Sequence, residues 1–564
     1  MGHRYYWELV SVIVQNSEQL CMAALHSMRF GCSNFFIPGG LGGGNMINYP
    51  IGIQTFEKIR SGDFLYVDKT KYIYELAHRY QYVFLSRPRR FGKSLLVSTF
   101  ESYFRGKKDL FNGLAIADLE TEWFEYPVLH FSLDTAKLGT VEDLRCQIKH
   151  QLRRMERGYG MPEGGENISE RFQSLVEDLY ETRGKRVVVL IDEYDSPMLN
   201  VLHDKDRLEQ MRTEMQGFYS PLKALDPYLR FVFITGITKF SQLSIFSQIN
   251  NLEVISMMPH FSAICGITNE ELKSDFGEGI AEMSEKYGLS QSEVLKRLKS
   301  KYDGYHFSYN GTGVYNPFSL LSAMKNADFE NYWFATGTPG FLLNQIRKFH
   351  TNITQIDGSM ADASEFDAPT DSMHSILPLF YQSGYLTIRE YDSRSRRYTL
   401  VYPNEEVKTG LTEYFIPYYV WSDINSTNNA CWDISEALMD GDIDRALTAA
   451  QGYFSSIPYQ EGTLMDAPSS EGHFTAMLYV MFSFLNKFVY SQVRVAKGRM
   501  DILVKTDSTV YVMELKLDGS VEEALQQIDD RKYAIPWQSD GRHVIKVGIN
   551  FSTKERSIES WKAV

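Results

Sequence analysis

Gly92, Lys93 and Ser94 have the residue types and the order needed to hold the phosphates of a nucleotide. In the pattern G-x-x-x-x-G-K-[ST], backbone N–H groups point at the phosphates, the lysine neutralises charge and the hydroxyl holds Mg²⁺. The segment "YVFLS-RPRR-FGKS-LLVSTF" offers a strand, a loop and the start of a helix. Arg87 stands where the pattern has its first glycine, so this segment alone leaves open a working site, a decayed site or chance.

A second segment, "VVVLIDEYDSP", follows about 100 residues later and ends an apolar run in Asp192 and Glu193. In phosphate-loop ATPases an aspartate at this point holds the Mg²⁺ shell, and a glutamate after it activates the attacking water. The alternative is a buried strand that ends in a solvated acidic turn. The two motifs together, in this order, predict a site for ATP and Mg²⁺.

A third strand end, in "FVFITGITKFS", carries Thr235, Thr238 and Lys239. A polar residue here could sense the γ-phosphate if this strand lies between the two motif strands. A strand end that is merely rich in threonine is the alternative. Asp195, just after the second motif, is interpreted as a cap of that turn.

Another group of chemical residues lies near the C-terminus, in "GRMDILVKTDSTVYVMELKL". Glu514 and Lys516 are two apart and therefore project from the same face of a strand, beside Asp501 on the neighbouring strand. Two carboxylates can hold Mg²⁺, and the lysine can activate water or stabilise a developing phosphorane charge. The alternative is a half-exposed hairpin on which charged and apolar residues alternate.

The flanking helices add candidates to this C-terminal group. Glu471 begins an amphipathic helix upstream and is a candidate further metal ligand, while a downstream helix could carry Gln527 and Tyr533 toward the site. Basic residues near these segments could bind phosphate without sequence preference, although ordinary surface charge explains them equally well. They are Arg494, Lys497, Arg499, Arg531 and Lys532.

The elements that must position these residues can be expected from apolar patterning. Four short runs, 82–86, 127–133, 186–192 and 230–236, are rich in β-branched and aromatic residues and mostly end in polar or glycine residues, as in buried parallel strands. They predict an α/β sheet covered on both faces. From about residue 266 the residue pattern predicts helices, with "TNEE" as a capping box. The segment "QSGYLTIREYDSRSRRYTLVYPNEEV" predicts a β-hairpin of the kind found in winged-helix units.

The expected organisation has five parts. They are an N-terminal extension at 1–45, a phosphate-loop domain at 46–265, a helical and winged-helix region at 266–454, a linker at 455–470 and a C-terminal α/β domain at 471–564. We expect the native protein to begin at Met46, with the glycine run before it a translated ribosome-binding region. A flexible glycine linker after a small helix is the alternative.

Composition limits the function classes. The net charge of −13 argues against a chain that coats nucleic acid over its whole surface, so any such contact must be local. The five scattered cysteines form no C-x-x-C pair, which argues against a disulfide scaffold or a zinc cluster and fits a reducing compartment. No apolar run is long enough for a transmembrane helix. We therefore expect a cytoplasmic protein with no membrane partner.

Several motifs resemble those of the AAA-ATPase-like family of bacterial, often Bacteroides-type, proteins, whose members carry a C-terminal domain of the PD-(D/E)XK nuclease superfamily. The resemblance runs from about Met46 to the C-terminus. It rests on "YPIGIQTFEKIRSGDFLYVDKT", "FLSRPRRFGKSLL", "LIDEYDSP", "TGITKFSQLSIFSQINNL", "YDGYHF", "YNPFSLL" and "YWFATGTP". It implies that an arginine-rich phosphate loop is the normal form. The resemblance implies a nucleotide site at Gly92, Lys93, Ser94, Asp192 and Glu193, with Glu193 catalytic. We expect Arg89, Arg90, Phe91 and Leu95 of the same loop to bind the nucleotide as well. Arg87 could add a phosphate contact or sense a neighbour.

The resulting hypothesis is an ATPase coupled to a Mg²⁺-dependent nuclease, with DNA favoured over RNA as substrate. Ser94, Asp192, Glu471, Asp501 and Glu514 would be metal ligands, and Asp501, Glu514 and Lys516 would cleave the phosphodiester. One alternative is an ATP-dependent switch or binding protein with an inactive nuclease-like domain. A second is a plain ATPase with no nucleic-acid partner. A homo-oligomer is a further candidate, because AAA sites often lie at subunit interfaces.

Overall fold

The computed structural model of the chain describes residues 48–564 apart from a set of internal segments. Those segments are 134–138, 240–250, 335–344, 346–348, 350–355, 369–372, 412–423, 457–474, 476, 480, 483–488 and 496–497. The expected extension at 1–45 and the candidate ligand Glu471 lie outside the described residues.

The first sheet has the strand order β2-β3-β4-β1-β5, and every neighbouring pair is parallel. Its strands are β1 (Tyr82–Ser86), β2 (Val128–Ser132), β3 (Val187–Asp192), β4 (Leu229–Gly236) and β5 (Leu252–Val254). The four predicted strands are confirmed, and β5 is an addition. Because all strands run the same way, their carboxyl ends, which carry the predicted motifs, meet at one edge.

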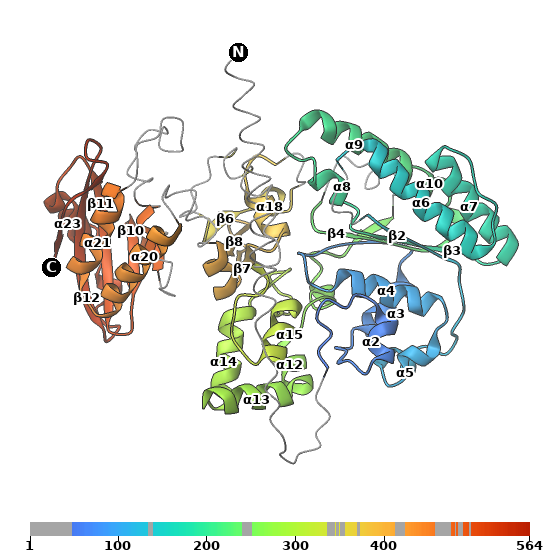
Figure 1. Ribbon diagram of the computed structural model, residues 1–564, viewed down its shortest axis with the longest axis horizontal. Helices are drawn as coiled ribbons and strands as arrows, with labels where there is room; N and C mark the ends of the chain where they lie inside the picture. Colours follow the sequence, from blue (N-terminus) through green and yellow to red (C-terminus); the bar gives the residue numbers. More distant parts are fainter. Residues whose placement is uncertain are drawn as a thin grey trace. The chain divides into compact units, whose positions relative to one another are not determined.

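Helices cover both faces of this sheet (Figure 1). Successive residues of β1 point to opposite faces: Val83 and Leu85 pack with α4, and Tyr82 and Phe84 pack on the other side. The helices are α2 (Phe56–Ser61), α3 (Thr70–Arg79), α4 (Lys93–Phe104), α5 (Ala115–Leu119), α6 (Val141–Tyr159), α7 (Ile168–Arg183), α8 (Ser196–Leu199), α9 (Lys205–Tyr219) and α10 (Pro221–Ala224). The predicted α/β sheet with two covered faces is confirmed.

The middle region begins with four helices that share one core. They are α12 (Asn269–Asp275), α13 (Gly277–Tyr287), α14 (Gln291–Tyr302) and α15 (Pro317–Asn326). The predicted capping box is confirmed, because the Thr268 hydroxyl accepts from the Glu271 N–H while the Glu271 carboxylate accepts from the Thr268 N–H. This reciprocal pair satisfies two N–H groups that have no partner inside α12.

The predicted hairpin is also confirmed. Strands β7 (Thr387–Asp392) and β8 (Arg397–Val401) pair antiparallel, and β6 (Ser359–Ala361) adds to β8 to make a three-stranded sheet. The short helices α17 (Ala363–Phe366) and α18 (Leu377–Gln382) pack beside it.

The C-terminal sheet has the order β13-β12-β11-β10-β9, in which only the β11–β12 pair is parallel among the described strands. Its strands are β9 (Val489–Val495), β10 (Gly498–Lys505), β11 (Thr509–Leu517), β12 (His543–Ser552) and β13 (Ser557–Ala563). Helix α23 (Val521–Asp530) packs against β11 and β12. The hairpin and following helix expected from the sequence are therefore present.

Two further helices, α20 (Ile424–Met439) and α21 (Ile443–Ser456), belong with this sheet. The Gln451 amide donates to the Ile558 carbonyl at 2.7 Å, and the Trp561 indole N–H donates to Asp444 at 2.8 Å. We therefore propose that the C-terminal domain includes α20 and α21, N-terminal to the expected start at 471.

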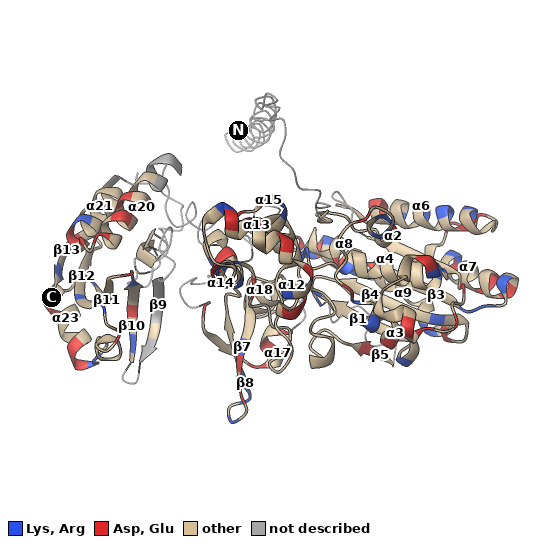
Figure 2. Cartoon of the chain, turned by 90° about the horizontal axis from the view of Figure 1, so that it is seen from below, with Lys and Arg blue, Asp and Glu red and all other residues tan. Residues whose placement is uncertain are grey.

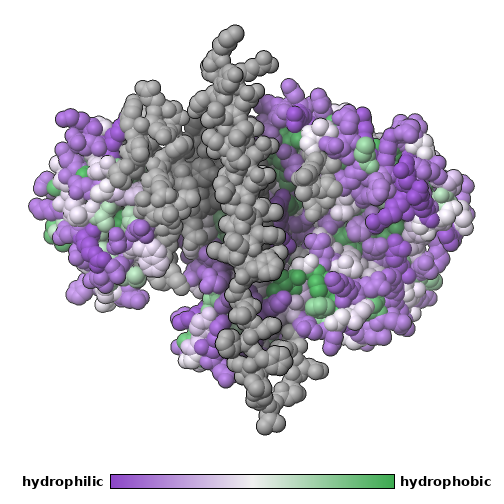
Figure 3. Space-filling view, viewed as in Figure 1, coloured by the Kyte–Doolittle hydropathy of each residue, from purple (hydrophilic) through white to green (hydrophobic). Residues whose placement is uncertain are grey.

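The apolar runs of the described residues lie inside the fold. Among the described residues, no helix combines the length and apolar character needed to cross a membrane. The face drawn in Figure 3 is mainly hydrophilic where it is described, with smaller apolar areas.

Candidate functional site

The predicted phosphate loop connects β1 to α4. Lys93 begins α4, and Gly92 immediately before it adopts the left-handed conformation with φ 91°. Arg90 also has a positive φ, 67°, which a side-chain-bearing residue adopts only at a cost. The turn brings the first N–H groups of α4 to the carboxyl edge of the sheet, where a helix N-terminus favours an anion.

Arg87, at the position of the missing glycine, has a structural role. Its side chain is 1% exposed and donates to the carbonyls of Ser86, Ser256 and Phe261 at 2.9, 2.7 and 3.1 Å. The guanidinium lies 4.0 Å from the centre of the Phe307 ring. Burial lowers the pKa of Arg87 to about 10. The expectation that Arg87 adds a phosphate contact is therefore wrong, because its donors already hold the base of the loop to neighbouring backbone.

Lys93 lies inside the loop. Its ammonium donates to the carbonyls of Arg87 and Pro88, each at 3.0 Å, and the residue is 5% exposed. Neutral carbonyls are weaker partners for an ammonium than phosphate oxygens are. The lysine is thus held where a phosphate could replace these acceptors.

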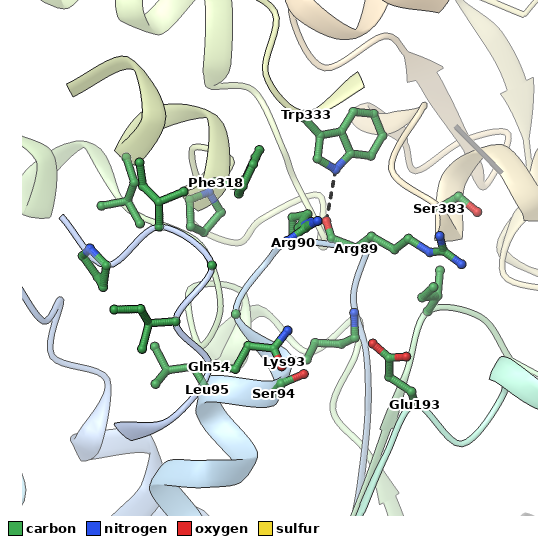
Figure 4. Close-up of a pocket in the computed structure, with 18 of the residues that line it drawn as sticks. Gln54, Arg89, Arg90, Lys93, Ser94, Leu95, Glu193, Phe318, Trp333 and Ser383 are labelled. Atoms are coloured by element: carbon green, nitrogen blue, oxygen red, sulfur yellow. Dashed lines mark hydrogen bonds between the residues drawn. The ribbon is translucent and has the colours of Figure 1, made fainter. Parts of the chain in front are cut away.

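The carboxyl end of β3 brings the acidic pair to the same edge. Asp192 is 4% exposed, and its carboxylate accepts from the Glu193 N–H at 3.0 Å. Glu193 has a positive φ of 52°, which turns its side chain toward the loop (Figure 4). Strand β4 lies between β1 and β3, which is the position that the γ-phosphate-sensing hypothesis requires.

The polar residues after β4 are engaged within the protein. The buried Thr235 hydroxyl donates to a backbone carbonyl of β1 at 2.8 Å. Asp195 accepts from the N–H and hydroxyl of Thr238 at 2.6 and 2.7 Å, and burial raises the pKa of this carboxyl. Lys239 pairs with Asp367 of the middle region. Asp195 therefore ties the ends of β3 and β4 together, and the γ-phosphate-sensing role of these residues stays a prediction.

A cavity of about 330 Å³ lies above the loop. Gly92, Lys93 and Ser94 form one wall with Glu193, and residues 50–54 form another. Figure 4 shows the Arg89 side chain extending across the cavity toward Ser383 and Glu193. The middle region closes the space with Pro317, Phe318, Leu321, Trp333, Phe334 and Tyr385. One end of the cavity is therefore cationic and polar, and the other is apolar and aromatic.

Most of the predicted nucleotide residues meet in this cavity. They are Arg89, Arg90, Gly92, Lys93, Ser94, Leu95 and Glu193. Asp192 lies next to Glu193 and is not among the lining residues. Phe91 is 1% exposed and packs against Tyr305 and Phe307, so it supports the loop from behind.

Sequence reasoning assigned no role to the residues that close the cavity. Phe318 lies in "YNPFSLL" and Trp333 in "YWFATGTP", two of the segments that carry the family resemblance. The Arg90 guanidinium lies 4.8 Å from the Phe318 ring centre, and the Trp333 indole N–H donates to the Arg89 carbonyl at 3.1 Å. These two motifs were the features of the sequence that could have pointed to Phe318 and Trp333 as residues of the site.

One buried carboxylate positions this closing wall. Glu406 is 0% exposed and accepts from the Tyr332 N–H at 2.5 Å, the Trp333 N–H at 2.7 Å and the Ser319 hydroxyl at 2.7 Å. Burial raises the pKa of Glu406, and these hydrogen bonds oppose that effect. Glu406 thus joins the start of α15 to the segment that carries Trp333.

The C-terminal candidates also converge. The β10–β11 register pairs Ile502 with Met513, so Asp501 stands opposite Glu514 one step further along. Asp501 is 8% and Glu514 1% exposed, and the Lys516 ammonium lies 4.0 Å from a Glu514 oxygen. The predicted shared face is confirmed.

Gln527 of α23 joins two of these residues. Its amide N–H₂ donates to Glu514, and its amide oxygen accepts from the Lys516 ammonium at 2.8 Å. Tyr533 instead donates to the Arg499 carbonyl at 2.9 Å. Gln527 therefore orients the carboxylate and the lysine together.

The donor set fits a hard divalent cation. Asp501 and Glu514 present carboxylate oxygens, the ligands that Mg²⁺ prefers, on one buried face. Among the described residues, no group of three or more His, Cys, Asp and Glu side chains could hold a metal ion. Mg²⁺ usually keeps several waters and binds through one or two carboxylates plus substrate phosphate, so two carboxylates are sufficient.

The surroundings of this group have mixed charge. An open depression of about 830 Å³ adjoins Lys516 and Gln527. Its rim carries Arg499 and Arg531, and also Glu522, Glu523 and Asp530. The expected local basic patch is therefore interrupted by carboxylates.

Comparison with known proteins separates the chain into two matched parts. Residues 50–246 match a family described as "Predicted AAA-ATPase", and residues 469–561 match the PD-(D/E)XK nuclease superfamily. A protein of Azotobacter chroococcum mcd 1, described as "Uncharacterized protein in vnfD 5'region", is 34% identical over 518 residues. The match covers 90% of this chain and 97% of that protein.

The arginines of the loop should separate into two classes. Arg87→Ala leaves three backbone carbonyls without a buried donor and should lower the free energy of unfolding by about 3 kcal/mol. Arg89→Ala, at an exposed position, should change stability by less than about 0.5 kcal/mol but weaken ATP binding roughly tenfold. Urea denaturation measures the free energy of unfolding, and titration with a fluorescent ATP analogue measures the affinity for ATP. An Arg87 variant of normal stability that binds ATP poorly would contradict the assignment.

Glu406→Ala should weaken ATP binding roughly tenfold, because two backbone N–H groups lose their buried acceptor and the Trp333 segment loses its position. The neighbouring Glu405→Ala is the matched control and should leave affinity unchanged. The same titration, with folding checked by circular dichroism, decides the matter. Equal affinities in the two variants would remove the positioning role of Glu406.

Proposed function

We propose that the chain hydrolyses ATP and cleaves DNA in a metal-dependent reaction. The premise is that the chain belongs to the AAA-ATPase-like family, whose members carry a C-terminal PD-(D/E)XK nuclease superfamily domain. The observation that carries the proposal is the cavity at the carboxyl edge of the first sheet. Lys93, Ser94 and Glu193 meet there from two strand ends that are separated by β4.

Each residue of the first site has a proposed role. The Lys93 ammonium and the first N–H groups of α4 bind the phosphates, and Arg89 adds charge from the opposite side of the cavity. The Ser94 hydroxyl and Asp192 hold the Mg²⁺ shell. Glu193 accepts a proton from the attacking water. The apolar wall of Phe318 and Leu321 suits the base of the nucleotide.

The C-terminal group is proposed to cut a phosphodiester. Asp501 and Glu514 hold Mg²⁺, which when bound stabilises negative charge on the phosphate. Lys516 positions or activates the attacking water, and Gln527 holds Lys516 and Glu514 in their relative orientation. DNA is the proposed substrate, with RNA as the alternative to be compared.

The middle region is proposed to transmit the nucleotide state. Trp333 bonds to the loop backbone, and Phe91 of the loop packs with centroid distances of 4.8 Å to Tyr305 and 5.5 Å to Phe307. A movement of the loop on ATP binding would displace these contacts. This arrangement supports coupling between the two activities.

We propose the cytoplasm as the compartment. Among the described residues, Cys146 is an exposed free thiol and Cys265 and Cys431 are buried free thiols. Burial raises the pKa of both buried thiols, which keeps them protonated and unreactive. Free thiols of this kind fit a reducing environment.

A second candidate is an ATP-dependent switch whose C-terminal domain binds a partner without cutting nucleic acid. The carboxylates Glu522, Glu523 and Asp530 on the rim of the depression favour it, because they repel phosphates. The net charge of −13 points the same way.

A cleavage assay on plasmid and single-stranded DNA should show cutting that requires Mg²⁺ or Mn²⁺ and stops with a chelator. Lys516→Ala should reduce cutting at least about a hundredfold, as loss of an electrostatic stabiliser does. Lys93→Ala should abolish ATP hydrolysis and make cutting insensitive to ATP.

The matched control is Lys554→Ala, an exposed lysine of the same domain that lies outside the proposed centre and should cut like the unaltered protein. Absence of cutting under every metal condition, with ATP still bound, would favour the switch. Cutting that persists in Lys516→Ala would contradict the proposed centre. ATP turnover that ignores added DNA would contradict coupling.

A further inference from the structure

The hairpin β7–β8 concentrates positive charge on an acidic chain. Arg389, Arg394, Arg396 and Arg397 are all exposed, and the hairpin holds only two carboxylates, Glu390 and Asp392, so its net charge is +2. Figure 2 shows the hairpin extending from the middle region with Lys and Arg positions near its tip. The local charge is therefore opposite in sign to that of the whole chain, −13.

The tip presents these arginines on an ordered turn. The Asp392 carboxylate accepts from the Arg394 N–H at 2.9 Å and the Ser395 hydroxyl at 2.7 Å, which lowers the pKa of Asp392. Arg396 is held at a positive φ of 56°. Within the described part of the chain, no carboxylate lies within 4.0 Å of the guanidinium of Arg394, Arg396 or Arg397, whereas Arg389 approaches Glu390 at 3.6 Å.

Three tyrosine rings pack against one another at the hairpin. Tyr398 packs edge-on against Phe366 at 5.1 Å, Tyr391 lies 4.6 Å from Tyr398, and Tyr309 lies 4.8 Å from Tyr391. The rings lead from the core outward, and Tyr309 at the outer end is 53% exposed. An aromatic ring that is this exposed and packs against the hairpin that carries the arginines offers a stacking face to a flat ligand.

The loop that carries Tyr309 is fixed to the hairpin. The Thr387 hydroxyl bonds both the N–H and the carbonyl of His306, at 2.7 and 3.1 Å. On the other side, the Thr312 N–H donates to the Ser262 hydroxyl at 2.9 Å. Tyr309 is thus ordered before any ligand arrives, which lowers the entropic cost of binding.

We propose that the hairpin β7–β8 and Tyr309 bind single-stranded nucleic acid, with the arginines on the phosphates and Tyr309 stacked on a base. Arginine grooves that follow a backbone, combined with aromatic rings, are the usual way to hold single strands without sequence preference. In a duplex the bases are stacked on each other, so the tyrosine would add nothing. The surface uses none of Asp501, Glu514 and Lys516, so it does not depend on whether that centre cuts.

Fluorescence anisotropy with a labelled 20-nucleotide oligothymidine and with a duplex of the same length tests the proposal on the full chain without metal. Arg394→Glu/Arg396→Glu/Arg397→Glu should weaken single-strand binding at least about tenfold and reduce its dependence on salt. The control Lys296→Glu/Arg297→Glu/Lys299→Glu, on exposed positions of α14, makes the same change in charge and should have little effect.

Tyr309→Ala should weaken single-strand binding on the order of tenfold and leave duplex binding unchanged, while Tyr309→Phe should retain the single-strand affinity. Equal losses in the hairpin and α14 variants would overturn the proposal, because net charge alone would then account for them. Single-strand binding that ignores all of these variants would overturn it too, and would leave the hairpin as a surface for an acidic protein. Cleavage measured separately keeps this result apart from that of the C-terminal centre.

Discussion

The parallel pairing of β1, β3 and β4 is the constraint on which the first site depends. Parallel strands bring their carboxyl ends to one edge of the sheet. The phosphate loop follows β1, the acidic pair Asp192 and Glu193 ends β3, and polar residues follow β4. With β4 in the middle, the loop after β1 and the acidic pair after β3 stand one strand apart, which leaves room for a phosphate between them. Asp195 reinforces this spacing, since it bonds across from the end of β3 to the turn after β4.

The cavity is completed by residues that come from another part of the chain. Glu406 fixes Trp333 and the start of α15, and Trp333 in turn bonds the phosphate loop. A buried carboxylate is costly unless its oxygens are fully bonded, and here three donors satisfy it. These hydrogen bonds link the loop, its apolar wall and the middle region in one network. A movement of one of these parts can therefore displace the others.

The C-terminal group follows from strand register in the same direct way. Antiparallel pairing places Asp501 opposite Glu514, and the two-residue repeat of a strand places Lys516 on the same face. Gln527 comes from α23, whose capping box at Ser520 and Glu523 fixes where the helix begins. The sheet supplies the positions, and the helix supplies the orientation of the side chains.

The sequence by itself determined the local elements: four strands of the first sheet, the phosphate loop, the capping box at Thr268, the hairpin and the Asp501–Glu514–Lys516 face. These depend on residues close together in the chain, whose periodicity and capping are visible in the pattern. Tertiary structure decided the role of Arg87, which turned away from the phosphate side to bond carbonyls about 170 residues distant. It also brought Trp333 to Arg89 across 244 residues and packed α21 on β13. Such contacts have no local signal, because they are selected by the fit of complete surfaces after the elements have formed.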